Sequence, residues 1–131
     1  MQVCRKLTSG RWSGTWTLIP EEYTEVIELA FHEGRIWGFG RDGNGNFEYS
    51  GEYDDRVGIS LLKTYTSRNS EDVITRRIYK GMWDGRRLSG GWFNEQNIWV
   101  AGSFHMWPGR GREPRYLFPG PEFTWETLLG D

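Results

Sequence analysis

The sequence has a single cysteine, Cys4, so the chain cannot form an internal disulfide bond. That absence favours a reducing compartment, and we expect a cytoplasmic protein. No apolar run approaches the length of about 18 residues that a membrane-spanning helix needs. The first ten residues, MQVCRKLTSG, also lack the apolar stretch of a signal peptide. No membrane partner is therefore expected.

The sequence also lacks an excess of basic residues, with a formal net charge of −2 and a pI near 5.7. Nucleic acids and anionic membranes usually bind a basic surface, so neither is expected as a partner. Histidine is scarce as well, since His32 and His105 are the only two, and one cysteine cannot complete a zinc site with them. We therefore predict no metal and no other cofactor.

Glycine (18 residues) and aromatic residues (16%) are abundant. They recur together in one unit: large residue, spacer, glycine, spacer, large residue. The unit occurs as WSGTW at 12–16, YSGEY at 49–53, YKGMW at 79–83 and LSGGW at 88–92. Its period of two is that of a β-strand, so the composition and the pattern both predict an all-β protein.

Eight strand-like runs follow one another along the chain, separated by turn-forming stretches of two to seven residues. They are predicted at 11–18, 23–32, 35–41, 46–54, 57–65, 73–83, 86–94 and 98–107. No connection is long enough for a crossover helix, so neighbouring strands must pair antiparallel. The simplest closed arrangement is an eight-stranded up-and-down β-barrel over residues 1–107, which leaves no free edge.

Two connecting stretches carry further expectations. Asp84-Gly85, between two alternating runs, predicts a two-residue hairpin turn. Residues 108–131 contain four of the five prolines. We predict that they form an extended C-terminal tail that packs on the barrel and ends in one or two helical turns.

The glycine–aromatic unit places its large residues and its glycine on one face of the strand, which we assign to the barrel interior. An eight-stranded barrel has an interior just wide enough for side chains. A glycine there lets the strand coil and leaves a gap that a tryptophan or a ligand can fill. One rim is predicted to be apolar, with Trp12, Phe31, Trp83 and Met106 pointing inward. The sequence leaves open whether these side chains plug that half completely.

Three stretches resemble the avidin and streptavidin family, whose barrels belong with the lipocalins to the calycin group. They are SGTWT at 13–17, the run from Gly34 to Asp54 that closes with SGEYD, and YKGMW paired with RLSGGW. The last pair is similar to the family's sixth and seventh strands. The resemblance covers most of residues 11–107 and implies a calycin-type barrel.

The biotin-binding residues of that family are mostly absent. Other residues stand at the matching positions: Leu18 and Glu21-Glu22 in the first turn, Gly40 for a tyrosine, Lys63 for a tryptophan and Phe104 for an aspartate. Trp92 matches, with Tyr79 at a second aromatic wall and Thr75 at a hydroxyl position. The resemblance therefore implies the fold, and biotin binding is not expected.

The inward positions at the opposite rim, where odd strands end and even strands begin, are polar and charged. The predicted ligand-binding residues are Tyr49, Lys63, Tyr65, Thr75, Arg77, Tyr79, Trp92, Asn94 and Phe104. The carboxylates of Glu25 and Asp42 are predicted to lie with them. Burying a charge without a partner costs several kcal/mol, so the two cations at this rim need an explanation.

The two buried cations at this rim have two possible explanations: the rim is a structural network, or it is a binding site. In the first, Glu25 and Asp42 neutralise Lys63 and Arg77. In the second, part of the positive charge awaits an anionic or carbonyl-bearing ligand, with Arg77 holding a carboxylate or phosphate by two hydrogen bonds. The preferred function is thus a small-molecule-binding barrel with a partly cationic mouth for an anionic or aromatic ligand.

A cofactor-free enzyme, such as a cyclase, isomerase or lyase, is the alternative. Asp42 or Glu25 would then be the general base, and Tyr79 or Lys63 the acid or oxyanion partner. A barrel that only binds another protein is the third possibility.

The outward positions include more apolar residues than a monomer normally exposes. They are Trp37, Phe39, Leu62, Ile74, Ile78, Met82, Phe93, Trp99 and Trp107. The C-terminal tail and a second subunit are the two available covers. We predict a homodimer through the outer barrel face, centred on Ile74, Ile78, Met82 and Phe93.

Overall fold

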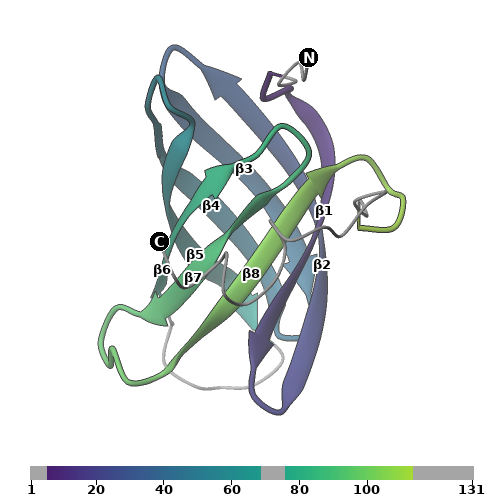
Figure 1. Ribbon diagram of the computed structural model, residues 1–131. Helices are drawn as coiled ribbons and strands as arrows, with labels where there is room; N and C mark the ends of the chain where they lie inside the picture. The colour runs from purple at the N-terminus through teal and green to yellow at the C-terminus, as the bar shows by residue number, and fades with distance from the viewer. Residues whose placement is uncertain (1–5, 69–75, 114–131) are drawn as a thin grey trace, which may run out of the picture.

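The computed structural model describes residues 6–68 and 76–113 as one closed antiparallel barrel (Figure 1). Its strands are β1 (Gly10–Leu18), β2 (Glu21–His32), β3 (Arg35–Asp42), β4 (Gly45–Tyr53), β5 (Gly58–Arg68), β6 (Arg76–Trp83), β7 (Leu88–Asn94) and β8 (Ala101–Pro108). Each strand pairs with the next, and β8 returns to pair with β1. The predicted eight-stranded up-and-down barrel is therefore confirmed.

No helix occurs among the described residues, and so none there is long and apolar enough to cross a membrane. The observed strands begin or end within three residues of the predicted ones, over the described ranges. The prediction that residues 73–75 begin the sixth strand lies outside the described residues. So do most of the predicted tail, from residue 114 onward, and Ile74 of the predicted dimer face.

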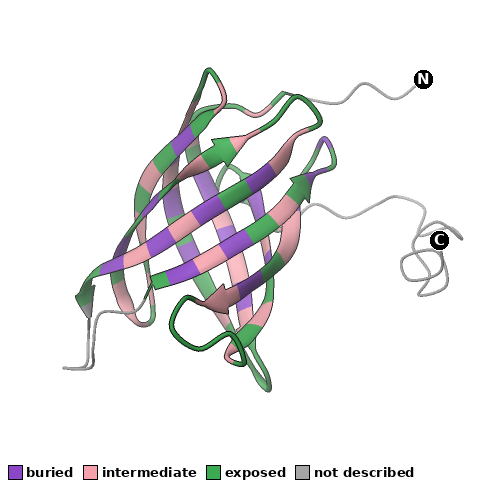
Figure 2. Cartoon of the chain, turned by 90° about the vertical axis from the view of Figure 1, so that its left-hand side faces the viewer, coloured by how far each residue is buried: buried purple, intermediate pink, exposed green. Residues whose placement is uncertain are grey.

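The strands form because large apolar residues alternate with polar ones, and the alternation decides which face is buried (Figure 2). In β1, for example, Trp12 and Trp16 are at most 1% exposed, whereas Arg11 faces solvent. The buried aromatic residues come from β1 and from β4 to β8, whereas the buried apolar residues of β2 and β3 are Ile27, Leu29 and Ile36. The barrel interior is thus a packed core of rings.

The mid-strand glycines let the strands pass one another closely where they coil. A Cβ atom at Gly90 would overlap the carbonyl oxygen of Lys80 and the Cα of Gly81 on the paired strand. At Gly102 a Cβ would overlap the carbonyl oxygen of Thr17, which accepts a hydrogen bond from the indole of Trp92. Because these glycines have no Cβ atom, neighbouring backbones and large rings can fit beside them.

The turn between β6 and β7 differs from the prediction by one residue. Trp83 pairs with Leu88, and the N–H of Asp84 donates to the carbonyl of Arg87, so the turn is centred on Gly85 and Arg86. The carboxylate of Asp84 accepts from the N–H groups of Arg86 and Arg87, and Gly85 has a φ of 98°. Asp84 therefore begins the turn instead of forming its centre, because its side chain caps the following backbone.

The outer face is partly as predicted. Trp37, Phe39, Met82 and Trp99 are 48–90% exposed, whereas Leu62, Ile78 and Phe93 are only half-buried. Trp107 points outward but is just 6% exposed, because the chain after Pro108 lies against it and Gly111 accepts a hydrogen bond from its indole. The homodimer through the β6–β7 face stays a prediction.

Candidate functional site

Four charged side chains point into the barrel near the rim that carries the β1–β2, β3–β4 and β7–β8 loops. Glu25 on β2 is paired with Asp42 at the end of β3, and Lys63 on β5 is paired with Arg77 on β6. Paired residues on adjacent strands point to the same face of a sheet. The strand register thus brings two carboxylates and two cations together inside one half of the barrel.

Lys63 is neutralised by both carboxylates. Its Nζ lies 2.9 Å from Oε1 of Glu25 and 2.8 Å from Oδ2 of Asp42, and its side chain has no exposed surface. The ammonium group also lies 4.1 Å from the centroid of the Phe47 ring. The first of the two sequence-based explanations, internal neutralisation, therefore describes Lys63.

The remaining hydrogen-bonding capacity of the carboxylates is taken up by aromatic donors. The hydroxyl of Tyr49 donates to Glu25 at 3.0 Å, and that of Tyr65 donates to Asp42 at 2.7 Å. The indole of Trp16 donates to the same oxygen of Asp42 at 3.1 Å. Each carboxylate is thus held by an ammonium group and at least one aromatic donor.

These surroundings change the acidity of the groups. Burial alone would raise the pKa of Asp42, but the charge and hydrogen bond of Lys63, together with the Tyr65 hydroxyl, hold that pKa below its usual value. Burial, with the negative charge of Glu25 added, raises the pKa of the Tyr49 and Tyr79 hydroxyls. Both hydroxyls are therefore neutral at physiological pH; that of Tyr49 donates to Glu25, and that of Tyr79 accepts from the Nζ of Lys63 at 3.4 Å.

Arg77 has a different environment, although it lies next to Lys63 on the paired strand. Its guanidinium carbon lies 4.2 Å from the centroid of the Trp16 ring and 4.4 Å from that of Trp92. The side chain is 7% exposed, and its buried Nε and Nη1 atoms have no hydrogen-bond partner among the described residues. The guanidinium is stabilised by contact with two indoles, whose ring planes are nearly perpendicular to one another, but its N–H groups remain to be satisfied.

Three further predicted site residues remain to be placed. Phe104 packs against Tyr79, with ring centroids 4.9 Å apart, and belongs to the core beneath the charged cluster. Asn94 is paired with Arg77 in the register, but its side-chain oxygen accepts from the N–H groups of Gln96 and Asn97 and so holds the β7–β8 loop. Thr75 lies outside the described residues.

Two residues of the cluster were not assigned to the site from the sequence. Trp16 contacts Arg77 and Asp42, and Phe47 covers Lys63. The signal for Trp16 was present, because it stands on the inward parity at the end of an odd strand, as the assigned residues do. Phe47 shares the inward parity of Tyr49 at the start of an even strand, so the same rule would have found it.

The cluster has little surface on which a substrate could react. Lys63 and Tyr79 are fully buried, and Glu25 and Tyr49 are at most 3% exposed. The side chain of Asp42 also has no exposed surface, and Arg77 is 7% exposed. No group of three or more His, Cys, Asp or Glu side chains suited to a metal ion occurs within residues 6–68 and 76–113.

No family model, curated protein or solved structure matches this chain. The closed antiparallel barrel of eight strands is consistent with a calycin-like fold in general. The finer resemblance to the avidin family remains one of short sequence motifs.

Proposed function

We propose that this barrel binds a small molecule through an anionic group that hydrogen-bonds to Arg77 at the polar mouth. The observation that carries the proposal is the buried guanidinium whose Nε and Nη1 atoms have no partner among the described residues. A buried donor left unsatisfied costs about 1–3 kcal/mol, and more when the group is charged. An anion at this position would accept hydrogen bonds that no described residue accepts.

The two indoles flank the guanidinium without enclosing it. Trp16 and Trp92 lie on adjacent sides of the group, since their ring planes are nearly perpendicular (86°) and their centroids are only 5.6 Å apart. Carboxylates and phosphates match an edge of a guanidinium group with two parallel hydrogen bonds. We therefore propose an oxyanion as the recognised group.

The contrast with Lys63 supports this choice of residue. Both carboxylates of the cluster contact Lys63, and neither forms an ion pair with Arg77 among the described contacts. Removing the Lys63 charge would strand two acids, whereas removing the Arg77 charge strands none of the described groups. The second explanation drawn from the sequence, a cation awaiting a ligand, therefore applies to Arg77 alone.

The cofactor-free enzyme is the weaker candidate. Its proposed acid, Tyr79 or Lys63, has no exposed surface, and a general acid must come within hydrogen-bonding distance of the reacting group. A binding function requires only that the ligand reach Arg77 at the mouth of the barrel.

The test compares Arg77→Met with the wild type and with Arg77→Lys, using sodium benzoate and inorganic phosphate as probes. We expect one or both probes to quench tryptophan fluorescence in the wild type, because Trp16 and Trp92 flank the guanidinium. Arg77→Met should abolish the quenching and leave the thermal midpoint unchanged or higher, because a buried unpaired charge is removed. Arg77→Lys keeps the positive charge but loses the planar guanidinium with its paired N–H donors, so weaker binding is expected.

Two results would contradict the proposal. One is a loss of about 3–5 kcal/mol of stability in Arg77→Met, which would show that the guanidinium neutralises a buried acid. The other is the absence of quenching by either probe, together with native mass spectra of freshly purified protein that show no bound small molecule.

A further inference from the structure

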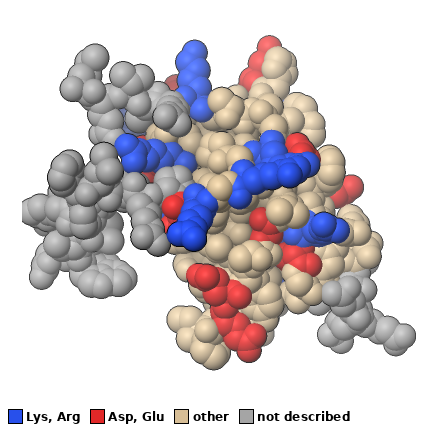
Figure 3. Space-filling view, turned by 90° about the vertical axis from the view of Figure 1, so that its right-hand side faces the viewer, with Lys and Arg blue, Asp and Glu red and all other residues tan. Residues whose placement is uncertain are grey.

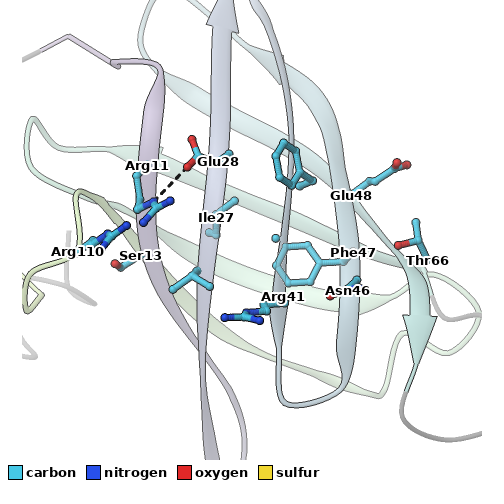
Figure 4. Close-up of a pocket in the computed structure, with 13 residues that line it drawn as sticks. Arg11, Ser13, Ile27, Glu28, Arg41, Asn46, Phe47, Glu48, Thr66 and Arg110 are labelled. Atoms are coloured by element: carbon cyan, nitrogen blue, oxygen red, sulfur yellow. Dashed lines mark hydrogen bonds and ion pairs between the residues drawn. The ribbon is translucent and has the colours of Figure 1, made fainter.

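A cavity lies outside the barrel, on the outer face of β1 to β5 (Figure 4). We call it the outer groove. It has a volume of about 790 Å³, and its lining includes Arg11, Val26, Phe39, Arg41, Glu48 and Arg110. It is separate from the mouth at Arg77, and the proposed function makes no use of it.

The floor of the outer groove is apolar and uncovered by the described residues. Val26 on β2 is 49% exposed, and Phe39 on β3 is 62% exposed. Val26 pairs with Arg41, and Phe39 pairs with Glu28 in the same ladder, so the two apolar side chains are diagonal neighbours. Exposed apolar side chains that adjoin in this way mark a surface that binds something.

The rim of the groove carries more positive than negative charge, with Arg11, Arg41 and Arg110 against Glu28 and Glu48. Figure 3, which views the molecule from the side of β1 and β2, shows Lys and Arg side chains across the middle of this face, with Asp and Glu side chains among them. Arg11 is paired with Glu28 at 3.1 Å, but Arg41 and Arg110 form no ion pair with any residue that the structure describes. The groove therefore suits an acidic segment that also carries large apolar side chains.

The end of this sequence has that composition. After Arg115 it contains no lysine or arginine, and two of its three acidic residues, Glu122 and Glu126, flank the aromatic residues Phe123 and Trp125. The chain passes the groove on its way, because Gly109 donates to the carbonyl of Arg11 and accepts from Ser13, at 2.7 Å each. An extended chain spans about 3.3 Å per residue, so residues 114–131 can reach about 60 Å from Glu113.

We propose that residues 121–131 dock in the outer groove of their own barrel. Phe123 and Trp125 would cover Val26 and Phe39, and Glu122 and Glu126 would pair with Arg41 and Arg110. A second barrel docking by the same face would instead bring together two surfaces that each carry three arginines and two glutamates, so that repulsion is expected on balance. The segment from the same chain also has the advantage of a high effective concentration.

The test measures thiol accessibility in the full-length chain. With Cys4→Ser removing the only native thiol, Thr66→Cys places a reporter on the groove, and Ser60→Cys places a control on the same strand outside it. Phe123→Ser/Trp125→Ser should speed labelling by a maleimide at position 66 at least ten-fold. At position 60 it should leave the rate unchanged.

A charge swap then tests the partners. Arg41→Glu should also expose position 66, and Arg41→Glu combined with Glu122→Arg and Glu126→Arg should restore its protection. Equal labelling rates with and without Phe123 and Trp125 would overturn the proposal. Protection that grows with protein concentration would assign the groove to a second copy, and protection indifferent to Arg41→Glu would place the segment elsewhere. Either result would also overturn it.

Discussion

The two ends of the barrel interior are packed differently. At one end Trp12 meets Trp83 and Phe31 at ring distances of 5.5 and 5.4 Å, above Leu88 and Met106, which are fully buried. At the other end four charged groups lie among the rings. The apolar end needs only shape and area, since each buried ring removes apolar surface from water.

The charged end needs a partner for every charge, and one charge is without a partner among the described residues. Lys63 has two carboxylates, while Arg77 has two indole faces and unsatisfied N–H groups. A chain that needed only stability would gain nothing from such a residue, because an apolar side chain of the same volume would pack as well. The contrast between the ends therefore identifies Arg77, and not Lys63, as the residue that stability does not explain.

The largest expected effect is that of Lys63→Met, which sharpens the comparison within the charged end. The substitution leaves Glu25 and Asp42 buried together without their shared cation. Stranding a buried charge typically costs about 3–5 kcal/mol, so a loss of that size is expected in the free energy of unfolding. Urea titration followed by circular dichroism measures it. The volume-matched Arg77→Met is the control, and if the two variants lose the same stability, the distinction between the two cations is wrong.

Much of this end could be predicted from the sequence, because two simple rules determine it. The period of two decides which residues face inward, and the up-and-down order decides which rim each strand end reaches. Those rules placed Glu25, Asp42, Lys63 and Arg77 together. They could not decide which cation the acids contact, because that depends on how far the side chains reach across the barrel. The flexible stem of Lys63 reaches β2 and β3, whereas the guanidinium of Arg77 lies against the rings of Trp16 and Trp92.

A smaller loss is expected where the two ends meet, at Gly90 on β7. An alanine there would place its Cβ on the carbonyl oxygen of Lys80 and the Cα of Gly81, so the paired strands must separate locally. Overpacking of this kind usually costs about 1–3 kcal/mol. Gly91→Ala is the matched control, because a Cβ there meets only the carbonyl oxygen of Gly102, at 3.4 Å. Thermal unfolding of the two variants measures the difference, and equal midpoints would mean that the glycine–aromatic unit has no packing role.

Acid should weaken the charged end before the apolar one. The pKa of Asp42 is lower in the folded chain than its ordinary value of 3.8, so folding is favoured while the carboxylate is ionised. That contribution is complete above about pH 4–5 and is lost as the pH falls through the folded pKa. In Asp42→Asn the free energy of unfolding should therefore fall less steeply than in the wild type as the pH is lowered below about 4. An unchanged slope would show that Asp42 does not carry the effect.

The smallest effect is expected outside the barrel, at His105 on β8. Burial, with the nearby charge of Arg87 adding to it, lowers the pKa of this half-buried imidazole below 6.5, and its Nδ1 lies 2.9 Å from the hydroxyl of Ser89. The unfolded chain then binds more protons than the folded one, so stability is complete above about pH 6.5 and falls as the pH drops below it. This window lies well above that of Asp42, which separates the two contributions. His105→Gln should remove the slope of unfolding free energy between pH 7 and 5, with His32→Gln as the control for loss of one imidazole. A slope that persists in His105→Gln would assign the titration to another group.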